Sequence, residues 1–165
     1  VIFSAGMNER VIRNKFPAIS SAFRDWVTAA IIVENMSCCR QAALAVFRNI
    51  KKVDAILKTA SILAERGFET VKAEILEHGV DSIRRFPYMG PATSFHLAKN
   101  LGLPHAKPDR HLVRVAHRTG FPSPAVMCDR ISQVVGDKVP VVDLVIWRYA
   151  TINRQYLSLF GTSAL

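Results

Sequence analysis

The sequence predicts a compact all-α domain, and three features of the chain indicate this fold class. Apolar residues recur at steps of three and four through most of the 165 residues, as a buried helix face requires. Glycine and proline separate these segments, and no stretch shows the alternation of a β-strand. Half of the residues are hydrophobic and 21% are charged, a globular composition. We expect one multi-helix domain over residues 1–165.

The N-terminal part of the chain predicts three helical segments. Residues 2–5 resemble the end of a helix, while 8–15 and 18–26 predict two helices joined at Phe16-Pro17. A joint is expected over 26–30. The chain begins at Val1 without a methionine, which we interpret as a domain truncated at its N-terminus.

The central part predicts two helices with glycine at their ends. Apolar residues at 53, 56, 57, 60, 63 and 64 form one face, with Lys51, Lys52 and Lys58 on other faces, and Gly67 ends this helix. A shorter helix over 69–77 ends near Gly79.

The C-terminal part predicts two more helices. Ser123 caps a helix that starts at Pro124 and stops before Gly136. From 140 to about 159 the chain is apolar almost all round, so we expect a largely buried helix. Asp143 is interpreted as a favourable charge near the positive end of that helix.

The overall charge and the cysteine content limit the partners. A formal net charge of +9 favours a polyanionic partner, although it also fits a basic protein charged for solubility. No apolar run is long enough to cross a bilayer, so no membrane partner is expected. Cys38, Cys39 and Cys128 fit neither a disulfide framework nor an iron–sulfur cluster, so we expect buried, inert thiols, no metal and a cytoplasmic protein.

A tight connection over residues 85–91 precedes the next helix. Pro87 fixes one φ angle, Gly90 permits a positive one, and Pro91 suits a first helical position. The buried face of the helix is predicted to carry Ser94, Leu97, Ala98 and Leu101. Unpaired backbone N–H groups at its start can bind phosphate, but the loop alone favours an ordinary joint between helices.

Asp109 is the only acidic residue between Asp81 and Asp129. It follows Pro108 and occupies the N-cap position of an amphipathic helix, where aspartate contributes about 1 kcal/mol. A cap and a reactive carboxylate are compatible roles. One face of this helix is basic and the other apolar; the basic face carries Arg110, Arg114, His117 and Arg118, and the apolar face carries Leu112, Val113 and Ala116.

Residues 88–93 and 107–115 together resemble the helix–hairpin–helix (HhH-GPD) DNA glycosylase superfamily. Their sequence is most similar to that of the archaeal-type 8-oxoguanine glycosylases. Residues 2–6 are similar to the family's helix before its DNA-intercalating loop. The resemblance implies an enzyme of base-excision repair that acts on double-stranded DNA without a cofactor, as a monomer. It would work at the nucleoid of a bacterium or in the nucleus of a eukaryote.

Two positions depart from the family pattern. Tyr88 stands where the hairpin has its first glycine, and Ala92 stands where bifunctional members carry the lysine that attacks the sugar. Lys99 lies about 10 Å further along the helix, and Lys107 is on the wrong side of the motif. The resemblance therefore implies a monofunctional glycosylase.

The resemblance also implies the roles of individual residues. Asp109 is the catalytic carboxylate, and the DNA contacts are assigned to Tyr88, Met89, Gly90, Ala92, Thr93, Arg110 and Arg114. Trp26, His96 and Trp147 are candidates for the base pocket, although each large aromatic also suits a helical core. Met7 or Asn8 is the candidate plug for the gap in the duplex, and a solvated loop is equally compatible there.

Three alternatives remain open: a non-catalytic DNA-binding module that keeps the hairpin, a bifunctional enzyme that uses another amine, and a helical protein-interaction domain. The motifs do not specify which base is removed.

Overall fold

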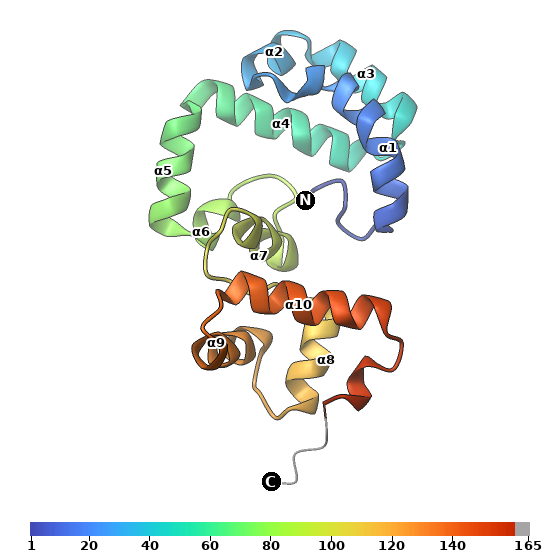
Figure 1. Cartoon of the computed structure of the whole chain (residues 1–165). Coiled ribbons are helices and arrows are strands. Elements are labelled where there is room, and N and C mark those ends of the chain that lie inside the picture. Colours follow the sequence, from blue (N-terminus) through green and yellow to red (C-terminus); the bar gives the residue numbers. More distant parts are fainter. Residues whose placement is uncertain (161–165) are drawn as a thin grey trace. The chain divides into compact units, whose positions relative to one another are not determined.

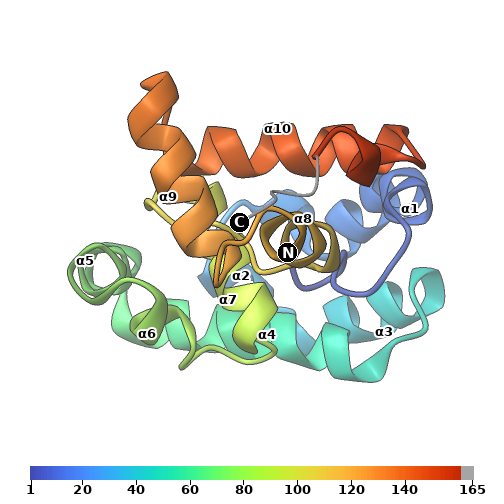
Figure 2. The same ribbon diagram turned by 90° about the horizontal axis from the view of Figure 1, so that it is seen from below.

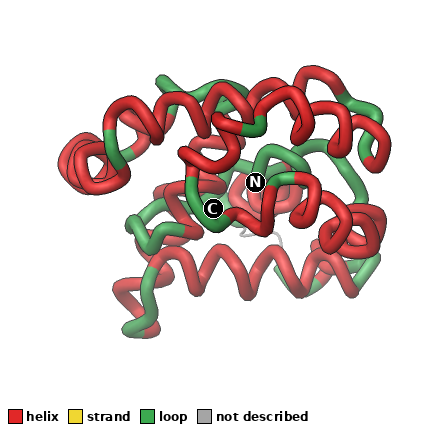
Figure 3. Tube along the Cα trace, turned by 90° about the horizontal axis from the view of Figure 1, so that it is seen from above, coloured by secondary structure: helices red, strands yellow, loops and turns green. Residues whose placement is uncertain are grey.

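The structure is a computed structural model that describes residues 1–160, and over that range Figure 3 shows only helices and connecting loops. The predicted all-α class is confirmed. The chain forms two compact units, Val1–Gly90 and the part from Pro91 onward. The expected single domain over 1–165 stays a prediction, and the two units are described one at a time. None of the described helices combines the length and the apolar character that a membrane span requires.

The first unit is built on α4, against which α2 and α3 pack, while α1 packs against α3 (Figure 1). Its core contains Phe3, Phe23 and Phe47, which lie within aromatic contact, together with apolar residues of α1–α4. The elements in order are α1 Glu9–Ala22, η1 Arg24–Trp26, α2 Ala29–Glu34, α3 Met36–Val46, α4 Ile50–Arg66, α5 Phe68–His78 and α6 Val80–Ile83.

The two helices predicted over 8–15 and 18–26 are wrong, because α1 runs through Pro17 without a joint. A proline inside a helix costs about 3 kcal/mol through its missing N–H and its ring clash. That cost is offset here because Ile19 and Phe23 are fully buried, and each contributes about 1.5–3 kcal/mol. The helix stops at Ala22, and Trp26 lies in η1, where three successive residues have positive φ.

The predicted helix ends at glycine are confirmed in this unit. Gly67 follows the last residue of α4 with φ 80°, and Gly79 follows α5 with φ 57°. Their backbone N–H groups donate to Leu63 O and Ile75 O, which satisfies carbonyls that the helices leave open.

The second unit packs α10 against α8 and α9 (Figure 2). Its core draws on all three helices and on Tyr156. As predicted, the Ser123 side chain caps α9 by accepting from Val126 N, and Gly136 follows that helix in the left-handed conformation. The elements are α7 Pro91–Asn100, α8 Arg110–Arg118, α9 Pro124–Val135, α10 Val139–Ile152 and η2 Tyr156–Ser158.

The helix predicted from 140 to about 159 is shorter and less buried than expected. It ends at Ile152, because the side chain of Asn153 accepts from Gln155 N and turns the chain. Only Val142, Asp143 and Ala150 are buried, while Leu144 and Val145 are more than half exposed. An apolar helix surface is buried only where other elements pack on it. The neighbouring helices of this unit pack on one face of α10.

Candidate functional site

Asp109 is held at the head of α8 by the backbone of that helix. Its φ of −88° and ψ of 169° are extended, and its Oδ1 accepts from His111 N at 2.8 Å and from Leu112 N at 3.0 Å. The predicted cap is therefore confirmed. Over residues 1–160, Oδ2 has neither a hydrogen-bond partner nor an ion pair, and the side chain is partly exposed. One carboxylate oxygen is fixed, and the other is available.

A buried ion pair supports the loop that leads to Asp109. The Lys99 ammonium of α7 pairs with Asp143 Oδ1 of α10, and Asp143 Oδ2 accepts from Lys107 N at 2.6 Å. Lys107 O in turn accepts from Asp109 N at 2.8 Å. Asp143 was interpreted only as a favourable charge near the start of α10, but it is 1% exposed and both of its oxygens have partners. The sequence did contain a signal for this burial, because Asp143 lies inside an otherwise apolar helix.

The basic face of α8 carries no compensating acid. Its residues Arg110, Arg114, His117 and Arg118 are exposed, and none of them forms an ion pair with any described residue. The apolar face of α8 lies at a different angle around the helix from the one predicted, because Val113 is 47% exposed and Val115 is buried beside Leu112. Three arginines without a carboxylate partner suit an anionic surface.

In the hairpin over residues 88–93, the residue with a left-handed φ is not the one that the sequence predicted. Tyr88 has φ 66°, and Gly90 is not among the described glycines with positive φ. The turn thus needs its left-handed residue at the position where the resembled family has glycine, and tyrosine adopts it at a cost of about 1–2 kcal/mol. Met89 is buried, and its N–H donates to Phe86 O.

Within the hairpin, the chain passes from the first unit to the second between Gly90 and Pro91. Pro91 is the first residue of α7, as predicted. Ala92 is exposed on the first turn and Thr93 is partly buried. Leu101 was predicted on the buried face of this helix, but it lies beyond the last helical residue and is 51% exposed.

Lys52 is a buried cation, although the helical periodicity predicted it on a face other than the apolar one. It is 2% exposed, and its Nζ donates to Phe3 O at 2.9 Å and to Ala5 O. The same Nζ lies 5.7 Å from the centroid of the Tyr88 ring. Burial lowers the pKa of Lys52. The Lys52 side chain therefore connects the N-terminal turn, α4 and Tyr88, the residue with the strained φ.

His96 is the pocket candidate whose surroundings are shared with Asp109. Burial, with the nearby cations Lys107 and Lys99, lowers the pKa of His96 to about 4, and the Asp109 carboxylate acts in the opposite direction. The imidazole is therefore uncharged at neutral pH. An uncharged imidazole can both donate and accept a hydrogen bond, which suits the edge of a base.

The pKa of His96 predicts a loss of stability in mild acid. The unfolded chain binds a proton near pH 6.5 and the folded chain near pH 4, so the stabilisation is complete above 6.5 and is lost as the pH falls toward 4. After discounting for partial exposure, we expect this loss to be about 1–2 kcal/mol. Urea unfolding at pH 7 and pH 4.5 measures it. The His96→Asn variant should lose correspondingly less than the wild type, and equal losses would contradict the assignment.

Three of the other predicted pocket and plug residues have structural partners: Trp147, Trp26 and Asn8. Trp147 is partly buried against the second core, and Trp26 stacks on Phe23 at 4.9 Å between ring centroids. The Asn8 side chain caps α1 by accepting from Arg10 N, while the neighbouring Met7 is 39% exposed. Trp26, Met7 and Asn8 belong to the first unit, and Asp109 belongs to the second.

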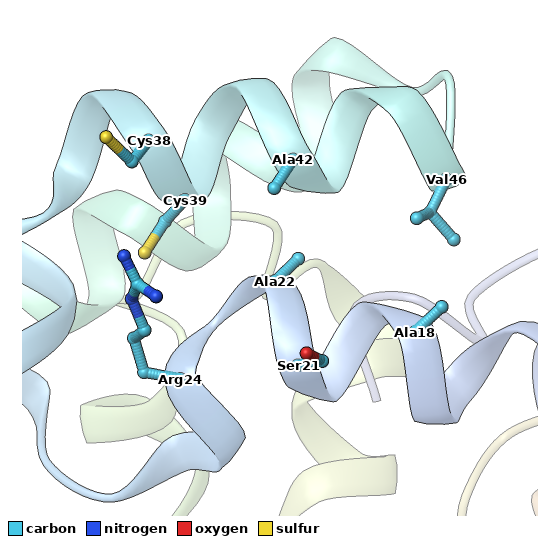
Figure 4. A pocket seen from close by; sticks show the side chains of 8 residues that line it. All are labelled: Ala18, Ser21, Ala22, Arg24, Cys38, Cys39, Ala42 and Val46. Atoms are coloured by element: carbon cyan, nitrogen blue, oxygen red, sulfur yellow. The ribbon is translucent and has the colours of Figure 1, made fainter.

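A pocket of about 330 Å³ lies in the first unit, between α1 and α3 (Figure 4). Its lining includes Arg24 and Cys38, but none of the predicted site residues. Cys38 is exposed, which corrects the expectation that all thiols are buried; Cys39 and Cys128 are buried, and burial raises the pKa of Cys128 to about 12. The residues that line this pocket all belong to the first unit.

No family model, curated protein or solved structure matches this chain. Over residues 1–160, no three His, Cys, Asp or Glu side chains gather as a metal site requires. In the second unit, the structure brings together a fixed carboxylate, an uncharged imidazole and a helix whose arginines form no ion pair with any described residue.

Proposed function

We propose that this protein is a monofunctional DNA N-glycosylase of the helix–hairpin–helix type. It hydrolyses the N-glycosidic bond of a damaged, mismatched or modified base that is flipped out of duplex DNA. The observation that carries the proposal is the Asp109 carboxylate, which is fixed through Oδ1 and open at Oδ2, at the head of a helix whose arginines have no acidic partner within residues 1–160.

The chemistry assigned to Asp109 follows from the charge that develops on the sugar. As the bond from C1′ to the base breaks, its electron pair leaves with the base and C1′ becomes positive. A carboxylate that is already oriented stabilises this charge without reorganising. Oδ2 also accepts a proton from the attacking water, whose oxygen forms the new bond to C1′. The flipped base is expected to contact His96.

The strand is left intact because no described lysine is placed like the family's nucleophile. Ala92 occupies that position on the first turn of α7 and has no amine. The ammonium of Lys99 is already paired with Asp143, and that of Lys52 donates to two backbone carbonyls. Base release should therefore leave an abasic site rather than a strand break.

The partner proposed for the basic face of α8 is the phosphate backbone. Each phosphate that a cation neutralises contributes about 0.9 to the slope of log K against log salt. Replacing both Arg110 and Arg114 with glutamine is expected to lower that slope by about 2, measured by fluorescence anisotropy with a duplex between 50 and 200 mM salt. Arg130→Gln/Arg148→Gln makes the same change in net charge on other helices. Equal slopes for the two double variants would argue against contact through α8.

The activity is tested with a panel of duplexes that each carry one altered base: an oxidised guanine, an alkylated purine, uracil, or thymine opposite guanine. We expect strand cleavage at one of them only after alkali, which opens abasic sites. Cleavage without alkali, with borohydride trapping of a covalent complex, would instead show a bifunctional enzyme. Salt-dependent binding without any base release would favour a non-catalytic module, and no salt-dependent binding would favour a protein-interaction domain.

A further inference from the structure

We propose that Asp143 is a positioning residue that sets the direction of the Asp109 carboxylate through the backbone of Lys107. This inference rests on the proposed function, because it assigns a role within the same site. Asp143 is on α10, 34 residues after Asp109 in the chain, and its own carboxylate makes no contact with the reacting groups in this assignment.

The contacts form a continuous series from one carboxylate to the other. Asp143 Oδ2 accepts from Lys107 N at 2.6 Å, Lys107 O accepts from Asp109 N at 2.8 Å, and Asp109 Oδ1 accepts from two backbone N–H groups of α8. The peptide groups on both sides of Lys107 are thereby occupied. Pro108 lies between and has a restricted φ, so the segment has few other conformations.

The burial of Asp143 makes this support rigid. Asp143 is 1% exposed, and both of its oxygens are used, one by Lys107 N and one by the Lys99 ammonium. Burying a carboxylate carries a large desolvation cost, which is offset only where the carboxylate is ion-paired and hydrogen-bonded. Here the pairing joins α7 and α10 to the loop that ends at Asp109, so all three meet at one side chain.

A role in positioning and a role in stability alone lead to different results. If the pair only stabilises the unit, removing it loosens the whole second unit, including α9. If Asp143 positions Asp109, what matters is an oxygen acceptor for Lys107 N, whether or not that oxygen is charged. Removing that oxygen then loosens the backbone of residues 107–112 alone.

Two charge-balanced double variants separate these roles. Lys99→Met/Asp143→Asn removes both charges and keeps an oxygen that can accept from Lys107 N, while Lys99→Met/Asp143→Ala removes that oxygen too. Because neither leaves a buried charge unpaired, both are expected to fold. The readouts are amide hydrogen exchange by NMR, duplex affinity, and the single-turnover rate of base release.

We expect the alanine variant to exchange the amides of Lys107, His111 and Leu112 at least about tenfold faster than the asparagine variant. Its rate of base release should be on the order of 10- to 100-fold lower, with duplex affinity changed by less than about twofold. The asparagine variant should stay near the wild-type rate. Similar behaviour of the two variants, or faster exchange that extends equally to Met127 on α9, would overturn the inference.

The amide exchange keeps this test separate from that of the proposed function. If the wild type releases no base from any duplex, the proposed function fails. The exchange at Lys107, His111 and Leu112 then still decides whether Asp143 holds the Asp109 segment in place. If base is released but the two variants exchange alike, the positioning role fails and the glycosylase assignment stands.

Discussion

Asp109→Asn is expected to lower the single-turnover rate of base release by at least about 100- to 1,000-fold, the range measured when one preorganised electrostatic group is removed. The amide keeps the size of the side chain and an oxygen that can accept from His111 N and Leu112 N, so the cap on α8 persists. What is lost is the negative charge that stabilises the sugar. The rate is measured with excess enzyme on the duplex that the wild type cleaves after alkali.

Duplex affinity and thermal unfolding serve as controls for Asp109→Asn. Both should stay close to wild type, because asparagine and aspartate are similar N-caps and Arg110 and Arg114 are unchanged. Asp137→Asn, an exposed acid outside the site, makes the same change in net charge and should have no effect on the rate. If Asp109→Asn retained the rate to within a few fold, Asp109 would be a cap alone.

Lys99→Met is expected to lower the free energy of unfolding by about 3–5 kcal/mol, because it leaves the buried Asp143 carboxylate without its cation. Urea denaturation at pH 7 measures this loss. Adding Asp143→Asn to Lys99→Met should restore most of it, since the remaining group is neutral and can still accept from Lys107 N. Equal stabilities of the single and double variants would contradict a strongly coupled buried pair.

An exposed pair gives the matched comparison for Lys99→Met. Arg13 and Glu9 lie four residues apart on α1 with both side chains more than half exposed. Arg13→Met should therefore change the free energy of unfolding by less than about 0.5 kcal/mol. A loss comparable to that of Lys99→Met would mean that burial of the charge does not determine the effect.

The features that the sequence predicted correctly depend on local interactions. Gly67 and Gly136 end helices because their own conformations allow a left-handed or extended exit, and Ser123 and Asp109 cap helices through N–H groups two or three residues away. Such signals need no knowledge of the tertiary fold, so they located several helix ends and the candidate catalytic carboxylate.

The features that the sequence did not predict depend on partners distant in the chain. Lys52 and Asp143 look like surface charges until Phe3 O, Lys99 and Lys107 N are placed beside them. The burial of Val115 rather than Val113 likewise depends on which side of α8 meets α10. Pairings of this kind arise only from packing.

The buried ammonium of Lys52 makes that lysine a built-in reporter of local opening. An amine-reactive reagent reaches it only when the N-terminal turn releases Phe3 O and Ala5 O, whereas the adjacent Lys51 is exposed and is modified directly. The ratio of acetylation rates at these two neighbours, followed by mass spectrometry, converts into the free energy of opening of that turn. Protection at one residue would thus report how often the start of the chain separates from α4.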